Sequence, residues 1–305
     1  MTEQLDSANL VDLVYLPGVP GQDDPAENYF EASKVHAESV RWDLPGAARL
    51  ARSPELRTMA GRSARRYDSR PVVPLPKAAP CDAPLGELLA SRRSATGFGG
   101  GPVPLAVLAG VLDRSYGLVT PRSTTWLRPA PSAGALYPLD LFVVNRTVVG
   151  LRTGGLYHFD PFRRLLADVG DCHHAALEEA LQAPAVTADP SFVVVVSAMF
   201  WRSRFKYGQR SLRFVLMEAG HVVQNLTLVA LAHGLHSRPL GGFQDDLLTA
   251  LLPDHNGVDD AAVYAVPIGT PAGADHPDSA GVPGHDLPAP GPYALPRDRE
   301  TENWR

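Results

Sequence analysis

The amino-acid sequence predicts an α+β fold in which helices cover both faces of a central sheet. Helical and strand patterns alternate along the 305-residue chain without a regular βαβ rhythm. No GxGxxG fingerprint follows a predicted strand, so a Rossmann domain is not favoured. The run SFVVVVSAMF, residues 191–200, is β-branched in both side-chain directions. This pattern suits a strand that is buried on both faces.

The first 80 residues are predicted to form an irregular N-terminal arm. YFEASKVHAESV (29–40) indicates one short helix in it. SPELRTMAGRSARRY (53–67) indicates another, with Ser53 as its N-cap and Pro54 at the first helical position. The prolines of DSRPVVPLPKAAPCDAP (68–84) disfavour regular structure over most of its length. We therefore expect an extended strap that leads into the main domain.

Residues 81–270 are predicted to form the main domain, and the Pro- and Gly-rich residues 271–305 a tail that is mobile or wraps a surface. Apolar spacing of three and four residues predicts helices, and short β-branched or aromatic runs predict strands. The expected helices are 84–94, 103–117 with its end at Gly117, 173–182 and 211–234, and the expected strands are 139–144, 155–160, 191–200 and 262–269.

Composition is ordinary for a globular protein, with 45% hydrophobic and 20% charged residues. A formal net charge of -5 argues against a nucleic-acid binder and gives no support for docking on anionic membranes. Cys81 and Cys172 lie too far apart for a CxxC motif, so a reducing compartment is favoured. We see no signal peptide and no apolar run of about 20 residues that would span a bilayer. The expected location is cytoplasmic.

Metal hydrolysis, serine hydrolysis and P-loop chemistry have little support in the sequence. His173 and His174, or His233 and His236, invite a metal hypothesis, but no HExxH motif and no carboxylate at ligand spacing accompanies them. Neither a GxSxG elbow nor a Walker loop is present. We therefore predict no metal site.

Three stretches carry residues that composition does not explain, and each has an alternative interpretation. In SRRSATGFGGG (91–101) the arginines suit a phosphate, or they complement a helix C-terminus. In RPAPSAGALYPLDLFVV (128–144) small residues let a ligand approach the backbone, or they form a tight turn. In SRPLGGF (237–243) two glycines admit a flat ligand or relieve crowding.

Three polar residues interrupt the otherwise apolar helix predicted at 211–234. Glu218, His221 and Asn225 are spaced at i, i+3 and i+7, so they share one face. Satisfied hydrogen bonds in a core would explain them. A helix that runs beside a polar ligand or a partner subunit would explain them equally well.

Taken in order, six motifs resemble the FMN-dependent nitroreductase superfamily, and within it the SagB/McbC-type azoline dehydrogenases of peptide natural-product pathways. They cover roughly residues 84–270, and YFEASKV resembles the segment that precedes the core in that family, which implies that the arm of residues 1–80 contacts a peptide or wraps a dimer partner. The resemblance implies a homodimer with a central antiparallel or mixed sheet, a long central dimer helix, and FMN at the subunit interface. The motifs are RRS, PSAGALYP, GLYHFDP, KYGQRSLRFVLMEAGHVVQNLTLVA, GLHSRPLGGFQDD and VYAVPIG.

The resemblance also implies a role for each matching residue. One set holds the FMN phosphate and pyrimidine edge, a second lines the flavin from the partner subunit, and a third approaches the ring near its reactive nitrogen. In chain order these sets are Arg92, Arg93 and Ser94; Pro131, Ser132, Ala133 and Gly134; and Leu240, Gly241 and Gly242. Lys206 and Tyr207 are implied to remove the substrate proton, with Arg204 and Arg210 supplying positive charge nearby. The alternative is that neighbours in sequence point apart and Lys206 is a solvated surface residue.

The implied reaction oxidises thiazoline or oxazoline rings to azoles in a ribosomally made, modified peptide, beside a cyclodehydratase that forms the rings. Two other functions stay open. Ala135 stands where nitroreductases often carry Asn, which disfavours but does not remove an NAD(P)H-dependent nitro or quinone reductase. No basic residue follows Ser94 closely or follows Gly269, which suggests a flavin-free scaffold subunit unless Arg210, Arg213 or Arg238 compensates.

Overall fold

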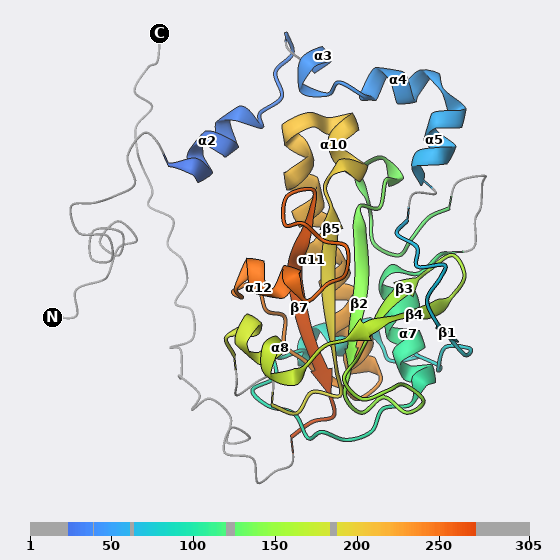
Figure 1. The fold of residues 1–305 in the computed structure, drawn as a ribbon. Helices are drawn as coiled ribbons and strands as arrows, with labels where there is room; N and C mark the ends of the chain where they lie inside the picture. The colour runs from blue at the N-terminus through green and yellow to red at the C-terminus, as the bar shows by residue number, and fades with distance from the viewer. Residues whose placement is uncertain (1–23, 39, 62–63, 120–125, 184–187, 273–305) are drawn as a thin grey trace, which may run out of the picture.

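The computed structural model describes residues 24–38, 40–61, 64–119, 126–183 and 188–272. The predicted tail from residue 273 onward and the first 23 residues of the predicted arm lie outside this part of the chain. The described residues form one sheet, the helices that cover it, and a series of short helices from the N-terminal arm (Figure 1).

The central sheet has seven strands, in the spatial order β1-β4-β3-β2-β5-β7-β6. Each of its neighbouring strands pairs antiparallel. The predicted α+β fold with a sandwiched sheet is therefore confirmed. The strands are β1 (Val72–Pro74), β2 (Leu139–Asn145), β3 (Gly155–Asp160), β4 (Leu165–Asp171), β5 (Phe192–Met199), β6 (His236–Ser237) and β7 (Asp260–Gly269).

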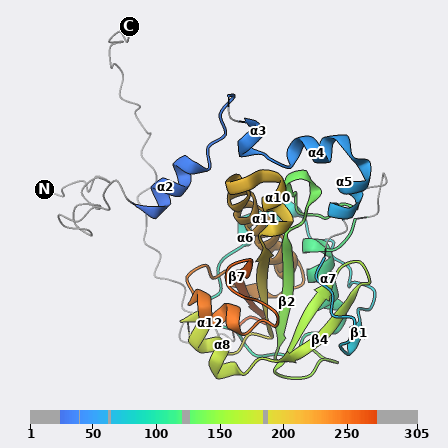
Figure 2. The ribbon, with the colours of Figure 1, turned by 45° about the horizontal axis from the view of Figure 1, so that its top comes forward.

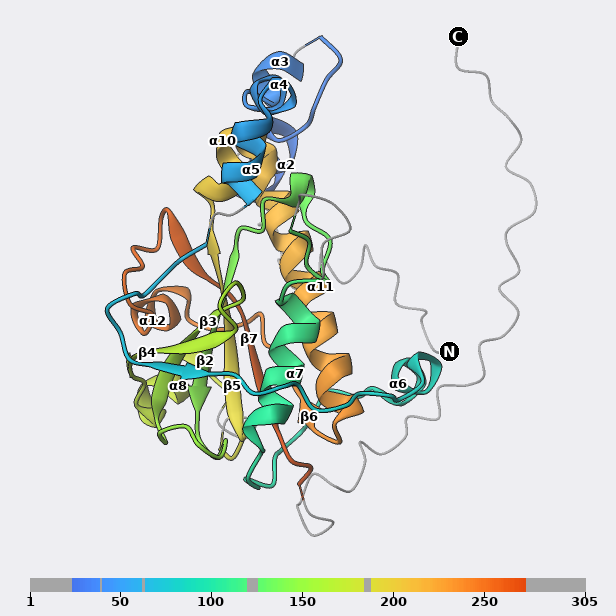
Figure 3. The same cartoon turned by 90° about the vertical axis from the view of Figure 1, so that its right-hand side faces the viewer.

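Helices cover both faces of the sheet, as Figure 3 shows from the side. The long helix and α7 lie together on one face, while two shorter helices, α8 and α12, lie on the other. The bounds are α7 (Leu105–Tyr116), α11 (Ser211–Ala232), α8 (His174–Leu181) and α12 (Asp245–Ala250).

The valine run of β5 explains how one strand serves both layers. Val194 and Val196 belong to the core beneath α7 and α11, whereas Val193 and Val195 belong to the core beneath α8 and α12. Alternate residues of a strand point to opposite faces. The β-branched run therefore fills both cores, as the sequence predicts.

The remaining helices lie at the edges of this sandwich. Figure 2 shows α3, α4 and α5 across the end of the molecule that α10 occupies. The predicted N-cap of α5 is confirmed, because the Leu56 N–H donates to Ser53 Oγ at 3.2 Å. These elements are α2 (Pro25–Ala32), α3 (Val40–Asp43), α4 (Ala47–Arg52), α5 (Pro54–Gly61), α6 (Leu85–Ser91), α10 (Trp201–Tyr207) and the short 3₁₀ turns η1 (Ala133–Ala135) and η2 (Gly208–Arg210).

The proline-rich strap differs from the expectation, because part of it forms β1 and pairs with β4. β1 lies at the edge of the sheet, with Pro74 as its last residue. Proline is tolerated there because an edge strand needs only one row of hydrogen bonds. Tyr67, just before β1, is already buried in the core, so this part of the predicted arm belongs to the main fold.

A buried ion pair fastens α10 to the sheet. Both terminal nitrogens of Arg202 contact the Asp140 carboxylate of β2, at 3.0 and 2.9 Å. Burial alone would raise the pKa of Asp140, but Arg202 and His158 outweigh it and hold that pKa far below its ordinary value. Arg202 therefore fixes the helix that ends in Lys206 and Tyr207.

The stretch Trp201–Ala232 is the one helical segment among the described residues whose length and apolar composition would allow it to cross a bilayer. The core helix of a soluble protein meets the same criteria. Most of this segment is α11, the helix that the sequence predicts at 211–234, and its buried apolar residues pack in the core.

Candidate active site

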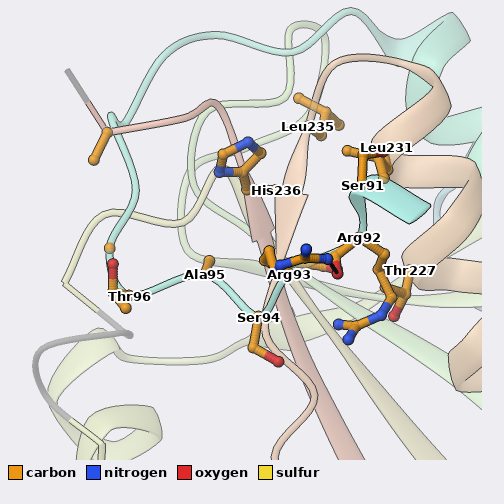
Figure 4. Close-up of a pocket in the computed structure, with 13 residues that line it drawn as sticks. Ser91, Arg92, Arg93, Ser94, Ala95, Thr96, Thr227, Leu231, Leu235 and His236 are labelled. Carbon is orange, nitrogen blue, oxygen red and sulfur yellow. Dashed lines mark hydrogen bonds between the residues drawn. The ribbon is translucent and has the colours of Figure 1, made fainter. Parts of the chain in front are cut away.

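Arg92, Arg93 and Ser94 directly follow α6 and line a cavity of about 340 Å³ (Figure 4). Arg93 folds back on α6, where its Nη1 donates to the carbonyl oxygen of Ala90 at 3.0 Å. The helix-capping alternative therefore describes Arg93 well. The Arg92 guanidinium instead makes no hydrogen bond or ion pair within the described part of the chain, although the Arg92 main chain bonds to Leu88 and Arg93. This guanidinium lines the cavity beside Thr227, where an anion would find free donors.

The segment Leu240–Gly242 lies on the same edge of the sheet. The Leu240 N–H donates to the carbonyl oxygen of Ala265 in β7 at 2.8 Å. Arg238 links this segment to the previous one, because its Nη1 donates to the carbonyl oxygen of Ala95 at 3.0 Å. A Cβ at Gly241 or Gly242 would meet no atom within 4 Å. Crowding within the described part of the chain therefore does not explain the two glycines. This observation favours the alternative in which they leave space for a ligand.

The turn Pro131–Gly134 lies elsewhere, at the start of β2. Gly134 has a φ of 66°, in the left-handed region that glycine adopts without strain. A Cβ at this position would lie 2.7 Å from Tyr207 Oη and would also collide with Lys206 Nζ. The missing side chain of Gly134 therefore makes room for both members of the predicted catalytic pair.

Lys206 and Tyr207 converge on this turn although they are neighbours in sequence. Lys206 Nζ lies 4.8 Å from the centre of the Tyr207 ring, and that ring packs edge-on against Phe214 of α11 at 4.9 Å. Both residues are half-buried. The alternative in which the two side chains point apart is wrong. Figure 2 shows the helix that carries them, α10, at the end of the molecule.

The arginines expected to assist these sites are engaged elsewhere. Arg204 stacks on the Trp201 ring at 5.0 Å. Arg210 Nη1 donates to the carbonyl oxygen of Ser33 at 3.2 Å, and Arg213 Nε donates to Ser33 Oγ at 2.8 Å. Of the three arginines considered as phosphate partners, only Arg238 lies next to the segment that contains Arg92.

The predicted site residues thus form two groups that lie apart. Figure 3 shows α6, which precedes Arg92–Ser94, and α10, which carries Lys206 and Tyr207, near opposite ends of α11. The arginine end comprises Arg92–Ser94 with Leu240–Gly242, and the lysine end comprises Pro131–Gly134 with Lys206 and Tyr207. Thr227, which lines the arginine-end cavity, follows Ser211 by 16 residues. That interval spans about 24 Å along a helix. One chain therefore does not bring the two ends together.

Glu218 is a buried acid that sequence reasoning noticed without assigning it to a site. Tyr116 Oη donates to Glu218 Oε1 at 2.6 Å, and the Ser132 hydroxyl also hydrogen-bonds the carboxylate. Burial raises the pKa of Glu218 to about 7, against the opposing effects of these bonds and of Arg128. Ser132 in turn accepts from the Tyr137 N–H at 2.9 Å. Glu218 therefore holds the lysine-end turn in place through its hydrogen bond with Ser132.

The three polar residues on α11 have different environments in the structure. Glu218 and Asn225 face α7, where Asn225 Nδ2 donates to the carbonyl oxygen of Ser115 at 3.4 Å. His221 is exposed. Nothing in the sequence singled out Tyr116 or Arg128 as neighbours of Glu218, because Tyr116 lies 102 residues before it and Arg128 follows Tyr116 by 12.

Comparison with known proteins agrees with this architecture. The model of the nitroreductase family matches residues 89–270. MJ1384 of Methanocaldococcus jannaschii, named as a nitroreductase, is 34% identical over 171 residues, which cover 55% of this chain and 83% of MJ1384. The microcin B17-processing protein McbC of Escherichia coli is 34% identical over 123 residues, which cover 39% of this chain and only 45% of McbC.

Two solved structures share the fold at low sequence identity. A protein of Ralstonia eutropha JMP134, named as a nitroreductase, has a TM-score of 0.57 and 22% identity, covering 68% of this chain and 93% of that one. A chain of the E. coli microcin synthetase McbBCD complex with truncated pro-MccB17 bound has a TM-score of 0.53 and 21% identity, covering 88% and 98%. The family match extends over more than half of the sequence, and this chain belongs to the nitroreductase family of oxidoreductases.

Proposed function

We propose that this protein is an FMN-dependent dehydrogenase that oxidises azoline rings to azoles in a ribosomally made, modified peptide. The observation that carries the proposal is the convergence of Lys206 and Tyr207 on Gly134 within a nitroreductase-family fold. The identity with McbC, which processes microcin B17, supports a peptide as the substrate. A cyclodehydratase that forms the rings is the partner enzyme that this substrate requires.

The arginine end offers donors suited to FMN. The Arg92 guanidinium, which makes no bond within the described part of the chain, lines the cavity together with Ser94. Ser91 and Thr227 also line it, but their hydroxyls donate to the carbonyl oxygens of Glu87 and Val223. We assign Arg92 to the phosphate, Ser94 to the pyrimidine edge, and Leu240–Gly242 to the side of the ring; Arg93 would join Arg92 at the phosphate on leaving the Ala90 carbonyl. FMN, when bound, supplies the two-electron acceptor that the ring oxidation needs.

We propose that two copies of the chain complete each site. The exposed face of α11 carries Leu216 and Met217, each 50% exposed. On the same face a Cβ at Gly220 would meet no atom within 4 Å, so a second helix has room to approach. We place the two-fold axis perpendicular to α11, which pairs this face with itself and sets the two helices antiparallel. The lysine end of one copy then meets the arginine end of the other.

The chemistry assigned to the lysine end is proton removal. Aromatisation of an azoline takes a hydride from one ring carbon and a proton from its neighbour. Lys206 Nζ and Tyr207 Oη are the groups assigned to accept that proton, because both side-chain ends reach the turn. Glu218 and Ser132 hold the turn, so that both acceptors keep a fixed position relative to the substrate.

A reductase of nitro or quinone compounds is the second candidate. The observation that favours it is the identity with MJ1384, which extends over most of that protein. The two functions differ in the electron donor, which is the azoline in the first and NAD(P)H in the second.

The experiment combines a spectrum with a product assay. The full-length protein is purified and its absorption is recorded in the visible flavin bands, with the chromophore identified after release. It is then given a cyclised peptide, and mass spectrometry measures the loss of two hydrogen atoms per ring. Bound FMN with ring oxidation supports the proposal. Bleaching of the flavin by NADPH without azoline oxidation selects the reductase, and a colourless protein that takes up no added FMN selects a scaffold subunit.

A further inference from the structure

The N-terminal helices contact the backbone of the segment that carries Lys206 and Tyr207. The Gly46 N–H donates to the carbonyl oxygen of Lys206 at 3.2 Å. A Cβ at Gly46 would lie 2.8 Å from Lys206 Cα and would also collide with the carbonyl oxygen of Phe205. The conformation of Gly46 is ordinary for any residue (φ -91°, ψ -10°), so only this close approach requires glycine.

A second glycine makes the reciprocal contact from the other side. Gly208, at the end of α10, has a φ of 53°, and a Cβ there would lie 3.1 Å from the carbonyl oxygen of Asp43. One glycine on each segment thus lets the two backbones approach closely. Side chains pack less tightly, because an apolar cavity of about 820 Å³ separates α4 and α5 from α10. Its lining includes Leu50, Met59 and Phe205.

Helix α2 extends the contact to the start of α11. Tyr29 Oη donates to the carbonyl oxygen of Gln209 at 3.1 Å. Arg213 reaches back to Ser33 Oγ at 2.8 Å, and its guanidinium lies 4.1 Å from the centre of the Phe30 ring. The backbone from residue 205 to residue 209 is therefore contacted along its length by residues 24–38 and 40–52, which we call the N-terminal brace.

We propose that the N-terminal brace positions Lys206 and Tyr207 for proton transfer, with Gly46 as the positioning residue that sets their distance from the turn at Gly134. The brace precedes the region matched by the family model, which begins at residue 89. The proposal rests on the catalytic role proposed above for Lys206 and Tyr207. A displacement of about 1 Å at a reacting group is enough to cost a large factor in rate.

The test is Gly46→Ala in the full-length protein, with Ala48→Ser as the matched control. Each change adds one heavy atom to the same stretch, but Gly46 is buried against α10 and Ala48 is exposed. Four quantities are measured: kcat and KM for the azoline peptide, FMN content, and the rate at which an amine reagent labels Lys206. Mass spectrometry reads the labelling rate, and exposed Lys77 serves as the internal reference.

Gly46→Ala is expected to lower kcat about tenfold or more while FMN content and KM stay within about twofold. It is expected to change Lys206 labelling relative to Lys77 by about threefold or more, because the backbone that carries Lys206 must move. Ala48→Ser is expected to leave all of these at wild-type values. A folded Gly46→Ala protein with wild-type kcat and wild-type Lys206 labelling would overturn the proposal.

Two further outcomes are also decisive. Should Gly46→Ala fail to fold, Ser33→Ala carries the test, because it removes the acceptor for Arg213 without adding atoms. Ser33→Ala is then expected to change kcat and Lys206 labelling in the same directions as expected for Gly46→Ala. Wild-type values for both would overturn the proposal. Should the wild-type protein bind FMN but oxidise no azoline, the proposed function fails, while the labelling measurement still tests whether Gly46 positions Lys206.

Discussion

At the scale of single residues, the central feature is the contact of Lys206 and Tyr207 with the turn at Gly134. Lys206 and Tyr207 both reach Gly134, which lies more than 70 residues earlier in the chain. Glycine is required there by its left-handed φ and by the two side chains that occupy the space of a Cβ. The sequence motifs indicated the turn at Gly134 and the pair Lys206 and Tyr207 separately. Their proximity became apparent only in the folded structure.

Lys206→Ala and Tyr207→Phe are expected to lower the rate of azoline oxidation by about 100-fold or more, the usual contribution of a general base. Bound FMN should stay at the wild-type level, because neither residue belongs to the arginine end. The measurement is single-turnover oxidation followed by mass spectrometry, with Lys77→Ala as the control at an exposed lysine. Wild-type rates in both variants would remove these residues from the mechanism.

Glu218 makes stability depend on pH in a direction opposite to that of most acids. Its pKa of about 7 in the folded protein exceeds the ordinary value of 4.5, so folding favours the protonated carboxyl. The stabilisation is complete below about pH 4.5 and is lost as the pH rises to about 7. Glu218→Gln removes this dependence. The free energy of unfolding of the variant, relative to wild type, should therefore rise by roughly 3 kcal/mol between pH 4.5 and 8.

Urea denaturation at several pH values measures this difference. Glu179→Gln, at an exposed glutamate of α8, should show no such trend. Parallel curves for Glu218→Gln and wild type would mean that Glu218 is ionised in the folded protein throughout this range. The groups that face Glu218 and set its titration are Tyr116, Ser132 and Arg128.

At the scale of elements, α10 is held from two sides. The Arg202–Asp140 pair fixes it to β2, and Gly46 lies against its last turn. Both contacts join segments that are far apart in sequence, so periodicity cannot predict them. The helix itself also escaped prediction, because WRSRFKY is short and has no apolar repeat.

Arg202→Met should lower the free energy of unfolding by roughly 3 to 5 kcal/mol, because it leaves the Asp140 carboxylate buried without its main partner. Arg204→Met on the same helix, at an exposed position, should change it by less than about 0.5 kcal/mol. Adding Asp140→Asn to Arg202→Met should recover part of the loss, since the uncompensated charge disappears. Equal unfolding midpoints for Arg202→Met and Arg204→Met would contradict this account of how α10 is held.

Elements with a strong local signal were predictable, and those that depend on distant partners were not. The helix at 103–117 ends at Gly117 as expected, and the β-branched run of β5 fixes a strand buried on both faces. β1 was missed because it has only three residues, lies among prolines, and forms a strand only by pairing with β4. β4 was missed because its sequence, LLADVGD, alternates too weakly. For the site, motifs supplied the residues, but no pattern could place the two groups at opposite ends of α11.

At the scale of the whole molecule, the separation of the two site groups is the feature with the largest consequence. The arginine end and the lysine end lie at opposite ends of a 22-residue helix that exposes the apolar side chains of Leu216 and Met217. In the function that we propose, each end of a single chain supplies half of a cofactor site. The proposed two-fold dimer would then hold two complete sites, each made from both copies.

Complementation between two inactive variants tests this shared site most directly. Arg92→Ala and Lys206→Ala proteins, each a dimer without azoline oxidation, are unfolded together, refolded as a 1:1 mixture and supplied with FMN. If each site takes Arg92 from one copy and Lys206 from the other, half of the dimers are mixed and each mixed dimer holds one intact site. The account predicts recovery of roughly a quarter of wild-type activity. Mixed dimers that form and show no activity would contradict it.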